Sequence, residues 1–262
     1  MFRSLKRYFG ALSPQVGSDK GRLTVVMDLD ETLCHVFAPD DVTGYNFKPD
    51  IQEDFFIKFP EKRSSLFIYK RPHLDEFLDY LGANFEPVVW GTGVKEYVDR
   101  VVDAIDPKGI FRHRLYQDQC SYERAQGYPQ FEFLKDISII PRDQGRIVVV
   151  DDDWQGMYKQ VDNFLYIEKY EAWYEDDWLK NDIPRFLNDL KDLPDVRPYL
   201  RARFMLKYAW AEDQQLYKLS SEDHLMAEFL SRHDHTEYDK IREKYDQLFK
   251  IQSPFIPEHK LW

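Results

Sequence analysis

Two aspartates at alternate positions, Asp28 and Asp30, follow directly on an apolar run at residues 23–27. A short apolar run of this kind is typical of a buried strand, and open α/β sheets bind ligands beyond the carboxyl ends of their strands. Alternate residues of an extended chain point the same way, so both carboxylates can face one ligand. Such a pair suits a hard divalent cation, or a nucleophile with a general acid. The alternative is a solvated acidic turn after a strand.

A second apolar run, at residues 147–150, is followed by Asp151 and Asp152. Between the two runs, the pattern predicts a hairpin at 55–59 and 65–69, a helix opening at Pro72, a strand at 87–90 and a helix over 94–105. Residues 110–136 show no clear period and are predicted to be mostly irregular. Strands that alternate with helices predict an α/β fold with a mostly parallel sheet.

The order Asp28-x-Asp30-x-Thr32 resembles the phosphatases of the haloacid dehalogenase (HAD) superfamily. The next residues, 33–35, narrow the resemblance to the branch that dephosphorylates the RNA polymerase carboxy-terminal domain. That branch also includes a receptor subunit of the mitochondrial presequence translocase. Further matching segments follow in the family's order, at 69–78, 88–93, 119–122, 134–137 and 147–152. The resemblance implies a HAD-like, Rossmannoid three-layer fold with a β-hairpin flap, followed by a helical carboxy-terminal extension.

The resemblance also implies roles for individual residues. Asp28 would attack the phosphorus of a phosphomonoester, and Asp30 would protonate the leaving alcohol and then activate water. Lys135 would bind the phosphoryl group as a point charge. Thr32 would orient the nucleophile loop and lie at the phosphate. Mg²⁺ would be held by the ligands that match the family, which are Asp28, the backbone carbonyl of Asp30, Asp152 and the adjacent Asp151.

One position departs from the family pattern. The family places a threonine or serine hydroxyl directly after the aromatic residue of the second strand, where this chain has Gly91. The hydroxyl comes one residue later, at Thr92, and a shift of one residue in an extended segment turns a side chain to the other side. We expect the phosphate to be met by Thr92 or by the backbone N–H of Gly91 or Thr92.

Composition limits the classes of function. The formal charge of −11 and the pI near 5.2 argue against a protein that grips nucleic-acid phosphates. Cys34 and Cys120 are too few for a disulfide framework and are interpreted as ordinary buried thiols. No apolar run reaches the ~18 residues of a membrane span, so we expect a soluble or peripheral protein. His35 and His73 are interpreted as structural, because oxygen ligands already complete the predicted metal site.

Three regions are predicted: residues 1–20, 21–203 and 204–262. The first contains Arg3, Lys6 and Arg7 with no acidic residue before Asp19, which is typical of a mitochondrial targeting segment; a short basic tail is the alternative. The second is the phosphatase-like domain. The third is aromatic-rich and mainly helical. It is predicted either to dock protein partners or to pack on the parent domain.

These observations lead to three hypotheses. The first is a Mg²⁺-dependent phosphatase of mitochondria, peripheral at the inner membrane in the intermembrane space or matrix. Its partner would be a phosphoprotein or a presequence-bearing polypeptide. The second is a non-catalytic import receptor, or an accessory subunit of a large inner-membrane or ribosomal assembly. The third is a nuclear phosphatase acting on the polymerase tail.

Overall fold

The computed structural model describes residues 12–15, 17–39, 48–59, 64–124, 131–157, 159–172 and 175–204. Most of the predicted targeting segment and nearly all of the predicted carboxy-terminal extension lie outside these ranges, so both stay predictions. Within the described ranges, no helix has the length and apolar character needed to cross a membrane.

Five parallel strands form the central sheet, in the order β10-β9-β1-β5-β6. The central strand β1 has β9 and β5 as neighbours, and every residue of these three strands is buried. Because parallel strands end at the same edge, the residues that follow β1, β5 and β9 are brought together. The predicted α/β class is confirmed. The strands span Thr24–Met27 (β1), Glu86–Trp90 (β5), His113–Leu115 (β6), Ile147–Asp151 (β9) and Phe164–Tyr166 (β10).

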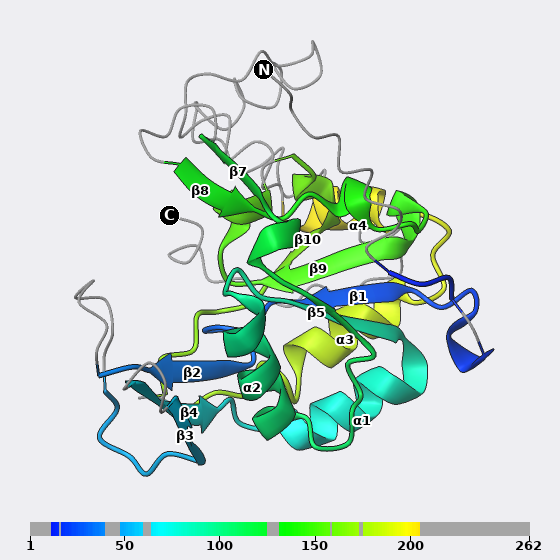
Figure 1. Cartoon of the computed structure of the whole chain (residues 1–262). Coiled ribbons are helices and arrows are strands. Elements are labelled where there is room, and N and C mark those ends of the chain that lie inside the picture. Colours follow the sequence, from blue (N-terminus) through cyan, green and yellow to red (C-terminus); the bar gives the residue numbers. More distant parts are fainter. Residues whose placement is uncertain are drawn as a thin grey trace, which may run out of the picture.

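Helices cover one face of this sheet, as Figure 1 shows for α1, α2 and α3. Their apolar sides meet Val25 and Met27 of β1 in one core, to which Phe77 of α1 and Val102 of α2 belong. The opposite face, which includes Val26, packs against short 3₁₀ turns instead of long helices. The helices span Leu74–Asn84 (α1), Lys95–Ile105 (α2), Asp182–Leu190 (α3) and Arg197–Phe204 (α4).

An antiparallel three-stranded sheet, in the order β2-β4-β3, is inserted between β1 and α1. The predicted hairpin at 55–59 and 65–69 is confirmed as β3 (Phe55–Phe59) and β4 (Ser64–Lys70), and β2 (Cys34–Phe37) adds a strand that the pattern did not indicate. Figure 1 shows this insert beside α2. Arg100 of α2 donates to the carbonyl of Lys58 at 3.0 Å, which attaches the insert to the main domain.

Some predictions about local structure are wrong. The described residues of the stretch 110–136 are not mostly irregular, because β6 lies there and β7 (Ser121–Arg124) pairs antiparallel with β8 (Phe131–Leu134). Strands of three or four residues are too short to show a period, and their pairing is decided by tertiary contacts. The first helix begins at Leu74 and not at Pro72, because His73 between them is left-handed with φ 65°.

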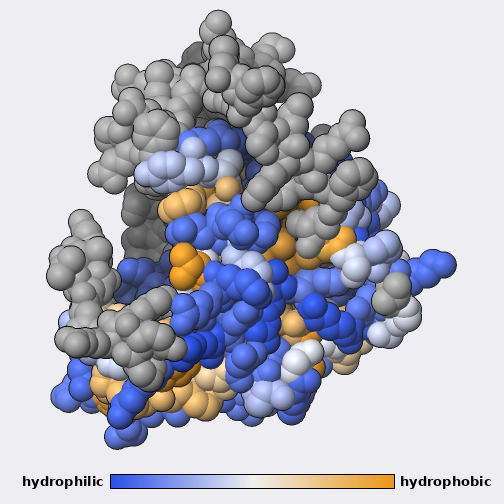
Figure 2. All heavy atoms as spheres, viewed as in Figure 1, coloured by the Kyte–Doolittle hydropathy of each residue, from blue (hydrophilic) through white to orange (hydrophobic). Residues whose placement is uncertain are grey.

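The surface is mostly hydrophilic in the view of Figure 2, with hydrophobic residues in separate patches. The large hydrophobic residues exposed by about half or more include Val94 (50%) and Tyr122 (61%). Val94 was predicted to belong to the buried stripe of its helix; it lies instead just before the first turn of α2, facing solvent. The rest of that stripe is buried, apart from Tyr97, which is half-buried.

The 3₁₀ turns fill the connections between these elements. They span Gly17–Asp19, Gln117–Gln119, Ile137–Ile139, Gln144–Arg146, Trp154–Met157 and Val161–Asn163.

Candidate active site

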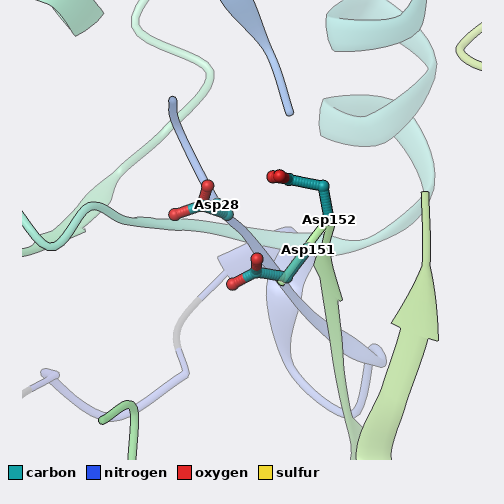
Figure 3. A group of neighbouring side chains, drawn as sticks. All are labelled: Asp28, Asp151 and Asp152. Carbon is teal, nitrogen blue, oxygen red and sulfur yellow. The ribbon is translucent and has the colours of Figure 1, made fainter. Parts of the chain in front are cut away.

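Lys135 and three aspartates form a cluster at the carboxyl ends of β1 and β9, buried except for Asp152, which is half-buried. Asp28 follows β1, and its backbone N–H donates to Val150 of β9 at 2.9 Å. Asp151 ends β9, and Asp152 follows it, as Figure 3 shows. The Lys135 ammonium donates to Asp28 Oδ1 and, at 2.6 Å, to Asp151 Oδ2. Predicted from three separate parts of the sequence, these residues therefore meet in one place.

Burial and mutual repulsion oppose the ionisation of carboxyl groups in this cluster. Burial, and then the charge of Asp151, raises the pKa of Asp28 well above its ordinary value, although Lys135 works in the opposite direction. The same two causes raise the pKa of Asp152 to about 7. Burial by itself would lower the pKa of Lys135, yet the carboxylates of Asp151 and Asp28 raise it overall. One ammonium therefore stands against three carboxylates, which leaves the site short of positive charge.

A divalent cation fits this arrangement. Carboxylate oxygens of Asp28, Asp151 and Asp152 all lie within 4.8 Å of one another. Hard cations such as Mg²⁺ take oxygen ligands, and added positive charge relieves the repulsion among buried carboxylates. Asp30, predicted to contribute its backbone carbonyl, has its side chain turned to another partner. It belongs to the site as a neighbour of this cluster.

The Asp30 side chain is held by Tyr97 of α2, whose hydroxyl donates to Asp30 Oδ1. Burial raises the pKa of Asp30 to about 6, and the Tyr97 hydrogen bond works against that rise. The sequence pattern placed Tyr97 only in an apolar helical stripe, so this contact was missed. The available signal was its hydroxyl, because a buried tyrosine O–H usually finds a partner.

Thr32 connects the nucleophile loop to the second strand of the site. Its side chain is fully buried, and Oγ1 donates to Asp152 Oδ1 at 2.9 Å. The predicted role of Thr32 in orienting the loop stays a prediction. The hydroxyl has a single proton to donate, so a Thr32 hydrogen bond to phosphate would have to replace the one to Asp152.

The Gly91 departure has a packing cause. A Cβ at position 91 would lie 2.9 Å from Val98 Cγ2 of α2, so a side chain there would require the Val98 side chain to move. The Gly91 N–H donates to the carbonyl of Leu115 at 3.2 Å and extends the β5–β6 pairing. It is therefore not available to a phosphate, contrary to one of our expectations. Thr92 is exposed, and its backbone N–H remains the candidate donor of this segment.

Arg71 contacts the nucleophile loop at the Thr32 carbonyl. No role was assigned to this residue from the sequence. Its side chain is fully buried and pairs with both oxygens of Asp176, at 2.9 and 2.6 Å. It also donates to the carbonyls of Thr32, at 3.0 Å, and Glu168, at 2.6 Å. One guanidinium thus connects three segments that surround the site.

His35, His73 and the two cysteines play no visible chemical part in the described site. His35 is buried and its Nδ1 lies 2.8 Å from Glu31 Oε1, which agrees with a structural role. His73 occupies the left-handed position before α1. Burial raises the pKa of Cys34 well above its ordinary value and that of Cys120 to about 11, so both thiols stay protonated. Cys34 is buried as predicted, whereas Cys120 is only half-buried.

The parallel sheet, with its acidic cluster at the carboxyl edge and its inserted antiparallel sheet, defines a phosphatase-type α/β domain of the HAD class. Residues 23–197 match the family model described as NLI interacting factor-like phosphatase. The chain belongs to this family.

Individual relatives agree with this assignment. The chain is 31% identical over 187 residues to human carboxy-terminal domain RNA polymerase II polypeptide A small phosphatase 1, covering 70% of this chain and 65% of that protein. It is 30% identical over 192 residues to CTD nuclear envelope phosphatase 1 of Xenopus laevis, covering 72% and 75%. For CTD small phosphatase-like protein 2 of Dictyostelium discoideum the identity is 32% over 198 residues, covering 75% of this chain and 32% of that protein.

Among solved structures, the fission yeast RNA polymerase II CTD phosphatase Fcp1 bound to beryllium fluoride aligns with a TM-score of 0.43 and 18% identity. The alignment covers 88% of this chain and 67% of that one. The chain spans between about a third and two thirds of the first curated relatives it matches.

Proposed function

We propose that this protein is a Mg²⁺-dependent phosphoprotein phosphatase that works through an aspartyl-phosphate on Asp28. The observation that carries the proposal is the contact of one buried lysine, Lys135, with the carboxylates that end two neighbouring parallel strands. The Lys135 ammonium in this position would hold Asp28 in place and face the space where phosphoryl oxygens would lie. Membership of the phosphatase family supports the same reaction.

In this mechanism Asp28 is the nucleophile and Lys135 provides fixed positive charge. A carboxylate oxygen of Asp28 bonds to phosphorus while the ester P–O bond breaks, which divides one difficult step into two easier ones. Lys135 offsets the negative charge that accumulates as the two anions approach. Asp28, Asp151 and Asp152 would hold Mg²⁺, which when bound adds charge stabilisation for the phosphoryl oxygens. Thr32 keeps Asp152 in register with the nucleophile loop.

Asp30 is the acid and base of the cycle. It gives its proton to the departing alcohol oxygen, and its carboxylate then takes a proton from the water that attacks the phosphorus of the aspartyl-phosphate. Release of inorganic phosphate restores Asp28. A pKa near 6 suits both halves, because the group exchanges protons readily close to neutral pH.

The test is Mg²⁺-dependent hydrolysis of an aryl phosphate by the wild type, Asp28→Asn and Asp106→Asn. Asp106 is a buried aspartate at the end of α2 that accepts from the backbone of Ile110 and Phe111, away from the site. We expect Asp28→Asn to lose on the order of 10³-fold or more in kcat/KM, as nucleophile removal does in other covalent enzymes. Asp106→Asn should stay within a few-fold. Absence of hydrolysis by the wild type would overturn the proposal.

For the substrate and the place of action, we propose a phosphoserine, phosphothreonine or phosphotyrosine protein in mitochondria. The support is the phosphatase family and the basic, acid-poor start of the sequence. Fractionation of cells that express the full chain with a carboxy-terminal tag tests the location. Recovery in the nucleus would favour the polymerase-tail hypothesis instead.

A second candidate is a non-catalytic import receptor or accessory subunit that keeps the fold. The observation in its favour is that the position of the family hydroxyl is a glycine whose N–H is used within the sheet. The hydrolysis assay separates the two candidates. An inactive wild type that binds a phosphopeptide or presequence peptide would support this second candidate.

A further inference from the structure

We propose that Tyr97 is a positioning residue for Asp30, and that its hydroxyl fixes the carboxyl group in the orientation that protonates the leaving group. This inference rests on the proposed phosphatase function and assigns a role to a residue outside the acidic cluster. Tyr97 stands in the first turn of α2, on a different element from the nucleophile loop. The helix α2 therefore affects the reaction indirectly, through one hydroxyl that orients Asp30.

The position of the Tyr97 ring is fixed by close packing. Its backbone N–H donates to Val94 at 3.0 Å, which closes the first turn of the helix. A Cβ at Gly93 would lie 2.5 Å from Tyr97 Cδ1, so the ring occupies the space that any side chain at position 93 would need. The ring also packs against the main core. The hydroxyl is thus delivered to Asp30 Oδ1 by a ring that has little room to move.

This contact distinguishes the two oxygens of Asp30. Oδ1 accepts the Tyr97 hydrogen bond, so the transferable proton belongs on Oδ2. When the ester P–O bond breaks and Asp28 bonds to phosphorus, the bonding electron pair goes to the alcohol oxygen. That oxygen takes the proton from Oδ2, and Asp30 is left as a carboxylate with Tyr97 still donating to Oδ1. Without the Tyr97 hydroxyl, the Asp30 carboxyl group can rotate. Its proton then points at the leaving alcohol oxygen for a smaller fraction of the time.

Such a role has a signature that a purely structural role lacks. Proton donation matters for a poor leaving group such as phenolate or an alkoxide, and hardly at all for a good one such as dinitrophenolate. A misplaced acid should therefore slow only the poor leaving groups. The quantity to follow is kcat/KM, since it reports the steps up to the first irreversible one.

The experiment measures kcat/KM for phenyl, 4-nitrophenyl and 2,4-dinitrophenyl phosphate with Mg²⁺ and the full chain. The variants are Tyr97→Phe, Gly93→Ala, Asp30→Asn and the matched control Tyr199→Phe, which removes another tyrosine–aspartate hydrogen bond, to Asp189 at 3.0 Å. We expect Tyr97→Phe to lose on the order of 10-fold or more with phenyl phosphate and under about threefold with dinitrophenyl phosphate. Gly93→Ala, which displaces the same ring, should show the same dependence.

The double variant Tyr97→Phe/Asp30→Asn completes the test. If Tyr97 acts through Asp30, removing its hydroxyl should change little once the acid is gone. An equal loss for all three phosphates, or losses that multiply in the double variant, would overturn the inference while leaving the phosphatase proposal intact. An inactive wild type would overturn both.

Discussion

The ammonium group of Lys135 lies between the carboxylates of Asp28 and Asp151 and donates to both. Asp28 follows β1, Asp151 ends β9, and Lys135 follows β8 of the small antiparallel hairpin. A single charge therefore ties the hairpin to the edge of the parallel sheet.

The first prediction concerns Lys135→Met. Removing one partner of a buried ion pair leaves uncompensated charge and typically costs about 3–5 kcal/mol. We expect a loss of this size in the free energy of unfolding in EDTA. The loss should be smaller in millimolar Mg²⁺, because a cation that binds only the folded state stabilises it. Urea unfolding in both solutions measures the difference. Lys159→Met, which removes more exposed pairs with Glu123 and Asp136, is the control.

The second prediction concerns pH. The folded-state pKa of Asp152 is raised to about 7, so between about pH 4 and pH 7 this group keeps its proton in the folded state and loses it in the unfolded chain. The stabilisation that the folded state gains from protonated Asp152 is therefore fully present below about pH 4 and is lost as pH rises through 7. In EDTA, Asp152→Asn should be more stable than the wild type at pH 8 and no more stable at pH 4. Equal differences at both pH values would contradict the raised pKa.

Mg²⁺ binding should carry the opposite pH dependence. The metal needs deprotonated carboxylates and competes with the protons that the raised pKa values of Asp28 and Asp152 retain. We expect affinity for Mg²⁺ to rise between pH 5 and pH 8. Isothermal titration calorimetry with MgCl₂ checks this, and a pH-independent affinity would place the metal elsewhere.

The third prediction concerns Gly91. Gly91→Thr places a side chain against Val98 of α2, and overpacking of this kind costs about 1–3 kcal/mol. The double variant Gly91→Thr/Val98→Ala should lose less unfolding free energy than the sum of the losses in the two single variants. Denaturant unfolding of the four proteins forms the cycle. Additive losses would show that Val98 is not what excludes a side chain at position 91.

The fourth prediction concerns Arg71. Arg71→Met leaves Asp176 buried without its partner and removes the hydrogen bonds to the Thr32 and Glu168 carbonyls. We expect a loss of about 3–5 kcal/mol in unfolding free energy. The control Arg201→Met removes a partly exposed pair with Asp162, and such pairs are worth about 0–1 kcal/mol. Similar losses for both variants would refute the special position of Arg71.

Several features could be predicted from local pattern. Three strands of the central sheet, β1, β5 and β9, were visible because each is a short, continuous apolar run, and such runs are typical of strands buried on both faces. The edge strands β6 and β10 were not predicted. The helical stripe of α2 was visible through its period. The acidic residues at the ends of two strands followed from the geometry of parallel sheets, and Asp28, Asp151 and Asp152 do converge.

Other features had no local signal. The β7–β8 pair is too short to show a period, and β2 appears as a strand only because β4 lies beside it. The helix start at Leu74 depends on the backbone of a single residue, His73.

The sequence by itself determined the fold class, the family motifs and the chemical types of the site residues, because these depend on residue identity and short-range spacing. Only the tertiary structure decided the partners: Tyr97 with Asp30, Lys135 with two aspartates, and Arg71 with three separate segments. Contacts of this kind join residues tens of positions apart. They depend on how a helix and a sheet pack against each other, which no local period records.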